Sequence, residues 1–137
     1  MSHVRTQIRQ AAVAALASVA AVKEGLDWPL AEEAVPLLLV STRDEEVQRG
    51  SLDTYSRTLD LIVEGVAKGP FVEDGLDALV ASTETVLNQS KLGGLCKPLL
   101  LQKIEISMER GATLIGRARM TFRCVYFTSQ TNPASAT

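Results

Sequence analysis

The clearest pattern of hydrophobic and polar positions covers residues 100–127, where the two kinds of residue alternate. The apolar positions of the first half are Ile104, Ile106 and Met108, and those of the second half are Ala118, Met120, Phe122, Cys124 and Tyr126. A period of two places one set on a core face and the other in solvent or at a partner. Residues 110–113 lie between the halves, so the pattern predicts an antiparallel hairpin. Its register brings two acidic residues near two basic ones, namely Glu105 and Glu109 near Arg117 and Arg119.

Two other segments show the three- and four-residue spacing of helices with one apolar face. The first follows Ser2, which can cap a helix beginning near residues 3–4, and Gly25 is expected to end it. Its apolar positions are Val4, Ile8, Ala11, Ala12, Ala15, Leu16, Val19 and Val22. The second is expected to begin near Val72 and to end at residues 92–94. Its apolar positions are Leu76, Leu79, Val80, Thr83, Val86 and Leu87.

Between the helices the sequence predicts two strands separated by a polar segment. Residues 37–40 are an unalternating apolar run, which indicates a strand buried on both faces or covered by a partner on one. Residues 57–67 form the next strand, with Leu59, Leu61, Val63 and Gly65 on its inner face and Thr58, Asp60, Ile62 and Glu64 on its outer face. The polar residues 41–56 are expected to be a long loop, either a mobile hairpin tip or a docking loop. Its candidate contact residues are Arg43, Asp44, Glu45, Glu46 and Arg49.

The order of these elements is helix, strand, strand, helix, strand, strand, which predicts an α+β fold. Two helices are expected on one face of a four-stranded, mainly antiparallel sheet. Residues 1–127 form the single domain in this prediction, and residues 128–137 form a flexible polar tail. The other sheet face, which carries Arg117, Arg119 and Arg123, is left uncovered and therefore available to a partner.

Composition excludes several classes of function. The 137 residues include 14 basic and 16 acidic side chains, so the net charge of −2 gives no basic field for nucleic acid. Apolar runs are too short to span a bilayer. The alanine-rich N-terminal segment carries Arg9 and Gln10 within it, which favours a structural helix over a signal peptide.

Candidate chemistry is scarce in this sequence. The single histidine, His3, has no plausible nucleophile near it, so we expect no catalysis. Cys96 and Cys124 do not have the spacing of a metal site, and Cys124 is expected to be a small buried hydrophobe. We therefore expect no metal and no cofactor. Trp28, the only tryptophan, is either an anchor that fixes the connector of residues 26–35 to the core or an interface hot spot.

Three parts of the chain resemble a known family. They are an N-terminal helix that opens VRTQIRQAA, a connector and strand that read WPLAEEAVPLLLVSTRDEE, and a final hairpin that ends GRARMTFRCVY. Together these resemble the tail terminator proteins of long-tailed bacteriophages, the minor tail protein U type of lambda-like phages.

The resemblance implies a structural protein of the virion, made in the host cytoplasm. Such proteins form a hexameric ring on the head-proximal end of the tail tube. The implied partners are other copies of the chain, the tail tube protein and the head–tail connector, while DNA passes through the ring without specific contact. Two alternatives stay open: another neck or head–tail joining protein, and a small α/β module that binds a ligand or peptide.

Overall fold

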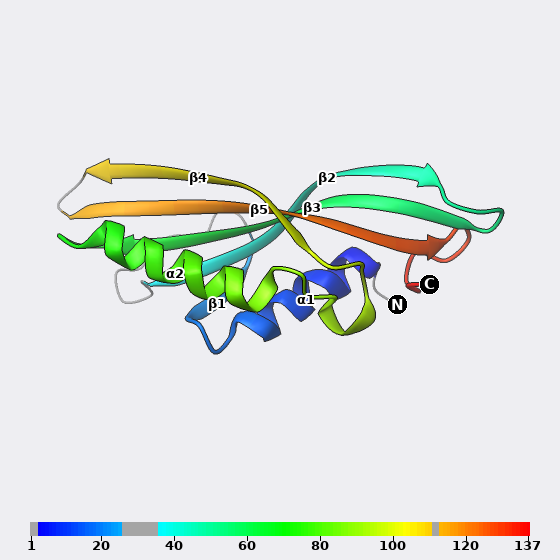
Figure 1. Cartoon of the computed structure of the whole chain (residues 1–137), viewed down its shortest axis with the longest axis horizontal. Helices are drawn as coiled ribbons and strands as arrows, with labels where there is room; N and C mark the ends of the chain where they lie inside the picture. Colours follow the sequence, from blue (N-terminus) through cyan, green and yellow to red (C-terminus); the bar gives the residue numbers. More distant parts are fainter. Residues whose placement is uncertain (1–2, 26–35, 111–112) are drawn as a thin grey trace.

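The computed structural model describes residues 3–25, 36–110 and 113–137. Within them the elements are α1 (Val4–Leu16), β1 (Ala21–Glu24), β2 (Leu37–Arg49), β3 (Thr54–Lys68), α2 (Val72–Leu87), the 3₁₀ turn η2 (Leu92–Gly94), β4 (Leu100–Arg110) and β5 (Leu114–Ser129). The strands form one sheet in the order β1-β2-β3-β5-β4. Among the strand pairs of the described residues, only β1–β2 is parallel. Both helices lie on the same face of the sheet (Figure 1), so the predicted α+β class is confirmed.

The sheet has five strands where four were predicted. Helix α1 ends at Leu16, six residues before the last position of its predicted stripe, and Val22 lies in β1. Val22 is partly buried against the core and aligns with Leu38 of β2. Val22 therefore contacts the core from a strand and not from a helix, and this strand also satisfies backbone groups along part of the β2 edge.

The main core lies between the helices and the inner face of the sheet. The part of each predicted stripe that lies within the observed helix is confirmed, because these residues are buried: Val4, Ile8, Ala12 and Leu16 in α1, and Leu76, Leu79, Thr83 and Leu87 in α2. Helix α2 ends at Leu87 and not at residues 92–94 as predicted, since those residues form the separate turn η2. The β3 side chains Leu59, Leu61 and Val63 complete this core with the alternate residues of β5. The apolar run of residues 37–40 is buried on both faces, as one of the two predictions for it required.

The prediction of a long loop over residues 41–56 is wrong. Strand β2 continues through it to Arg49, and β3 resumes at Thr54, so the turn between them covers only residues 50–53. Beyond Thr42 most β2 side chains are exposed. Backbone hydrogen bonds to β3 hold this half of the strand, and such bonds leave no hydrophobic alternation in the sequence.

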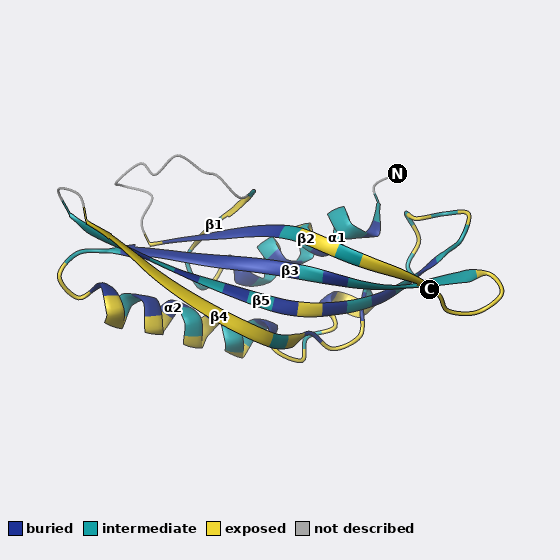
Figure 2. Ribbon diagram, turned by 90° about the horizontal axis from the view of Figure 1, so that it is seen from above, coloured by how far each residue is buried: buried dark blue, intermediate teal, exposed yellow. Residues whose placement is uncertain are grey.

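The predicted core face of β4 is also wrong in one respect. Ile104, Ile106 and Met108 point to the helix side, opposite Met120, Ala118 and Gly116 of β5, as the hairpin register requires. They are nevertheless exposed, because α2 packs on β3 and β5 while β4 is the outermost strand. Figure 2 shows β4 exposed along almost its whole length.

The C-terminal residues turn back toward the start of the chain. The backbone N–H of Val4 donates to the carbonyl of Pro133 at 2.9 Å. The side-chain amide of Gln7 donates to the carbonyl of Ala134 at 2.8 Å. The backbone N–H of Thr137 donates to Phe127 of β5 at 3.0 Å. The mobility expected for residues 128–137 stays a prediction, since hydrogen bonds in one conformation do not measure it.

Candidate interface surfaces

The outer face of the sheet carries the predicted arginines. In β5, Arg117, Arg119 and Arg123 alternate with buried residues and lie on the face away from the helices. The Arg117 guanidinium lies 3.6 Å from a carboxylate oxygen of Glu64 on β3. Arg119 lies between Glu64 and Glu105 in the register. Glu105 is 3.7 Å from Lys103 of its own strand, whereas Glu109 lies opposite Ile115.

Two shallow hollows on this face contain charges of both signs. One, of about 260 Å³, is lined by Glu64, Glu105, Ile106, Ser107, Arg117 and Arg119. The other, of about 350 Å³, is lined by Asp44, Glu46, Thr58, Asp60, Gln102 and Arg123. Arginines next to carboxylates on an open sheet face suit charge-assisted contacts with a partner of similarly mixed charge.

Four of the five candidate residues of segment 43–49 lie along the outer edge of β2. Strand β1 pairs with β2 only as far as Val40, so among the described residues nothing pairs with this edge beyond that point. Arg43, Asp44, Glu46 and Arg49 are exposed there. An open edge offers backbone N–H and C=O groups to another chain, and charged side chains limit unspecific pairing.

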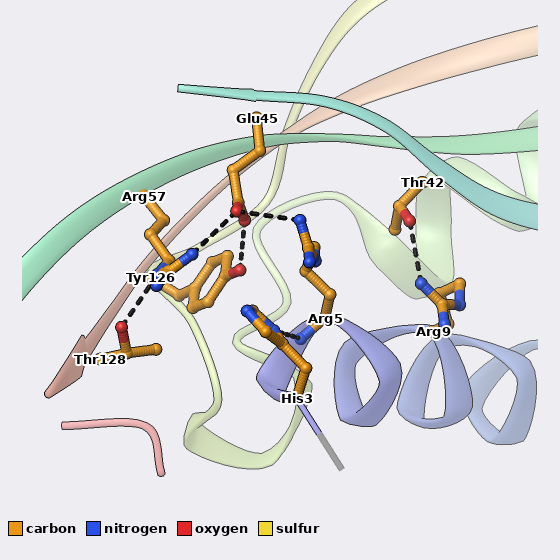
Figure 3. A network of polar contacts seen from close by, with 8 residues as sticks. All are labelled: His3, Arg5, Arg9, Thr42, Glu45, Arg57, Tyr126 and Thr128. Carbon is orange, nitrogen blue, oxygen red and sulfur yellow. Dashed lines mark hydrogen bonds and ion pairs between the residues drawn. The ribbon is translucent and has the colours of Figure 1, made fainter. Parts of the chain in front are cut away.

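Glu45, the fifth, is less exposed than the other four, and a β-bulge precedes it on β2. The register with β3 shifts between Thr42 and Glu45, and the inserted residues turn the Glu45 side chain to the helix side, opposite Leu59. Its carboxylate is only 6% exposed and contacts three side chains (Figure 3). Arg57 donates to Oε2 at 3.0 Å, Arg5 of α1 donates to the same oxygen at 3.3 Å, and the Tyr126 hydroxyl donates to Oε1.

Neighbouring groups extend this inner cluster. Arg57 also donates from Nε to the hydroxyl of Thr128 at 2.9 Å. His3 caps α1 through Nδ1, which accepts from the backbone N–H of Arg5 at 3.0 Å. Partial burial, together with the nearby Arg5 guanidinium, lowers the pKa of His3. Burial and the hydrogen bond to Glu45 raise the pKa of Tyr126, so its hydroxyl remains a donor at neutral pH.

Sequence reasoning missed this cluster. Tyr126 was assigned correctly to the inner face, but Arg5 and Arg57 were not singled out. One signal for this cluster was available in the sequence. Arg57 shares the inner face of its strand with the apolar positions that follow it, and an inward arginine needs a counter-charge. The bulge that supplies Glu45 has no sequence signature in this polar run.

The remaining candidates add no chemistry to these surfaces. Trp28 lies outside the described residues. Cys96 and Cys124 are both buried and not in a disulfide. The hydrogen bond to Cys96, and then burial, raise the pKa of Cys124, which keeps this thiol protonated. Within the described ranges, no group of three or more His, Cys, Asp or Glu side chains could hold a metal ion. No helix in the described part of the chain is long and apolar enough to cross a membrane.

Comparison with known proteins identifies the fold but no family. No family model and no curated protein sequence matches the chain. Among solved structures, the chain is similar to one from the virion of a native gene transfer agent particle. The two share 20% sequence identity and a TM-score of 0.51, with 90% of each chain covered. At this identity the likeness shows a shared fold over nearly the full length of both chains.

Proposed function

We propose that the protein is a structural component of a phage-like virion and acts by assembly, without catalysis. The observation that carries this proposal is the fold likeness to a chain of a gene transfer agent particle over 90% of both chains. The open sheet face with its arginines and the exposed β4 strand support it. Surfaces of this kind are typical of subunits that are completed by neighbours.

Within that class, we propose the role of a tail terminator. The ring of this proposal contains six copies, covers the head-proximal end of the tail tube, stops tube growth and presents a surface to the head–tail connector. DNA passes through its lumen without specific contact. The resemblance of the N-terminal helix, the β2 region and the final hairpin to the tail terminator family supports this finer role.

The test is removal of the gene from the genome that encodes the particle, followed by negative-stain imaging. We expect tails of uncontrolled length and heads without joined tails, and rescue by the wild-type chain. Tails of normal length that fail to join heads would instead indicate another neck or head–tail joining protein. Unchanged, infectious particles would contradict a virion role altogether and would favour the binding-module alternative.

A further inference from the structure

The two ends of the long sheet carry complementary features. Strand β3 alone has 15 residues and so spans about 50 Å. The β2–β3 turn lies at one end of the sheet, and the N-terminus of α2 lies at the other, beside the end of β4 (Figure 1). Each end has exposed apolar side chains, and the charges around them differ.

At the α2 end there is an apolar groove with an acidic rim. It has a volume of about 270 Å³ and is lined by Leu76, Ile106 and Met108 with Glu73 and Asp77. Ile106 is 56% exposed, so the β4 side of the groove is open. Asp74 adds a third carboxylate to the first turns of α2, and no lysine or arginine occurs in that helix.

The groove is a built feature of the fold. Its Met108 side lies against Gly116 of β5, where a Cβ would come within 3.0 Å of the Met108 sulfur and 2.8 Å of a Leu76 methyl. The absence of a side chain at Gly116 therefore lets α2 and β4 approach each other over β5.

At the opposite end the hairpin tip exposes a leucine, and cations lie near it. Leu52, in the turn, is 81% exposed, and Val47 near the end of β2 is exposed as well. Arg49 ends β2 beside them. Lys97 lies close by, since its ammonium is 5.8 Å from the Phe127 ring, which adjoins the turn at Gly50. Asp53 is the one acidic residue of the turn.

We propose that the β2–β3 tip of one copy docks into the α2–β4 groove of the next, with Leu52 among the groove side chains and Arg49 against Glu73 and Asp77. The contact joins two different surfaces, so it is head-to-tail and closes a ring when the rotation permits. Twofold pairing of either end with itself would bring like charges together, which is unfavourable. This inference rests on the proposed ring function and specifies its contact.

Cysteine trapping tests the contact directly. Under a mild thiol oxidant such as diamide, the double variant Leu52→Cys/Ile106→Cys is expected to form a reducible ladder of dimers, trimers and larger species. A mixture of the two single variants should stop at dimers that contain one copy of each, which mass spectrometry can identify. Each single variant alone serves as the control for the native Cys96 and Cys124. Dimers of Leu52→Cys with itself, or no ladder from the double variant, would overturn the proposal.

Charge reversal supplies a second measurement on the trapping background. Arg49→Glu or Asp77→Arg should each lower the ladder yield about tenfold, because like charges then meet. Arg49→Glu combined with Asp77→Arg should restore it, whereas equal loss in the combination would contradict the pairing. A sixfold ring in particles without any ladder would refute this contact but not the function. A ladder from a protein that is absent from particles would support this contact but refute the proposed function.

Discussion

The two faces of the sheet use the same pair of residue types in opposite ways. On the inner face, Glu45 is 6% exposed and Arg57 is 12% exposed, and their ion pair is closed over by α1 and Tyr126 (Figure 3). On the outer face, which no helix covers, Arg117 is 26% exposed and forms a longer contact at 3.6 Å with Glu64, whose side chain is 9% exposed. The carboxylates are buried in both pairs, so the pairs differ in the exposure of the arginine and in the length of the contact. Those two quantities, and not the identity of the charges, decide what an ion pair contributes.

The inner cluster therefore stabilises the fold, and the more accessible outer arginines are available for contacts in an assembly. A buried pair is costly to break because the remaining charge has lost its water and its partner. An exposed pair contributes little to the monomer, since water replaces the lost contact. The following variants measure this contrast, from the largest expected effect to the smallest.

Glu45→Ala should be the most destabilising of these variants. It leaves the Arg57 guanidinium in the core without a counter-charge, and removal of one member of a buried pair costs about 3 to 5 kcal/mol. Urea denaturation followed by circular dichroism gives the free energy of unfolding. The matched control is Glu46→Ala, one position along on the exposed side of β2, where a change within about 0.5 kcal/mol is expected. Equal effects of the two variants would show that the inner pair has no special role.

Tyr126→Phe should have an intermediate effect. It keeps the buried ring but removes the hydroxyl that donates to Glu45 Oε1. A hydrogen bond to a charged group contributes about 1.5 to 3 kcal/mol, so unfolding should become easier by that amount. In a Glu45→Ala background the same substitution should cost much less, because its partner is already gone. Additive losses in this double-mutant cycle would contradict a direct coupling between the two side chains.

The sequence predicts the contrast between the inner and outer sheet faces only where a strand shows hydrophobic alternation. Alternation in β5 correctly assigned Arg117 and Arg119 to the outer face, because buried residues alternate with more accessible ones from Ile115 to Ser129. It failed in β2, where the bulge between Thr42 and Glu45 changes the facing of each later side chain. Side-chain period cannot reveal an inserted residue within a run that is polar throughout.

Strand β4 shows a second limit. Its alternation predicted correctly which side chains share a face with Met120, but not whether a helix covers them. Coverage depends on where α2 lies across the sheet, and α2 is positioned by contacts with β3 and β5. These are tertiary facts that no window of the sequence contains. The exposed stripe Ile104, Ile106 and Met108 could therefore be found only in the folded chain.

Arg119→Glu tests the outer face, where we expect a small effect on the fold. The free energy of unfolding should change by only about 0 to 1 kcal/mol, since Arg119 lies on the outer face, away from the main core, where charged contacts contribute little. Assembly should suffer more if the outer face meets a partner, because a desolvated charge contact costs about 2 to 5 kcal/mol when one member is removed. Two measurements separate the effect on assembly from the effect on the fold. They are the tail length in complemented particles and the thermal unfolding of the purified variant. Normal tails would show that the arginines are only a solvated face.

The smallest expected effect is a pH dependence at the edge of the inner cluster. The pKa of His3 is lowered from 6.5, first by burial and then by Arg5, and its Nδ1 must stay unprotonated to accept from the Arg5 N–H. The unfolded chain therefore binds a proton more readily than the folded one. Below about pH 6.5 the free energy of unfolding should fall, and the fall should end below the lowered folded pKa.

His3→Asn isolates this contribution from that of the carboxylates. Asparagine caps a helix about as well as the best residues, but it does not titrate. At pH 8 the two proteins should be similar in stability, because His3 is neutral in both the folded and the unfolded chain. Between pH 6.5 and 5 the wild type should lose stability faster than His3→Asn, as measured by urea denaturation at each pH. Since His3 is the only histidine, parallel curves over this range would mean that its cap does not sense protonation and that the inner cluster is insensitive to pH at this end.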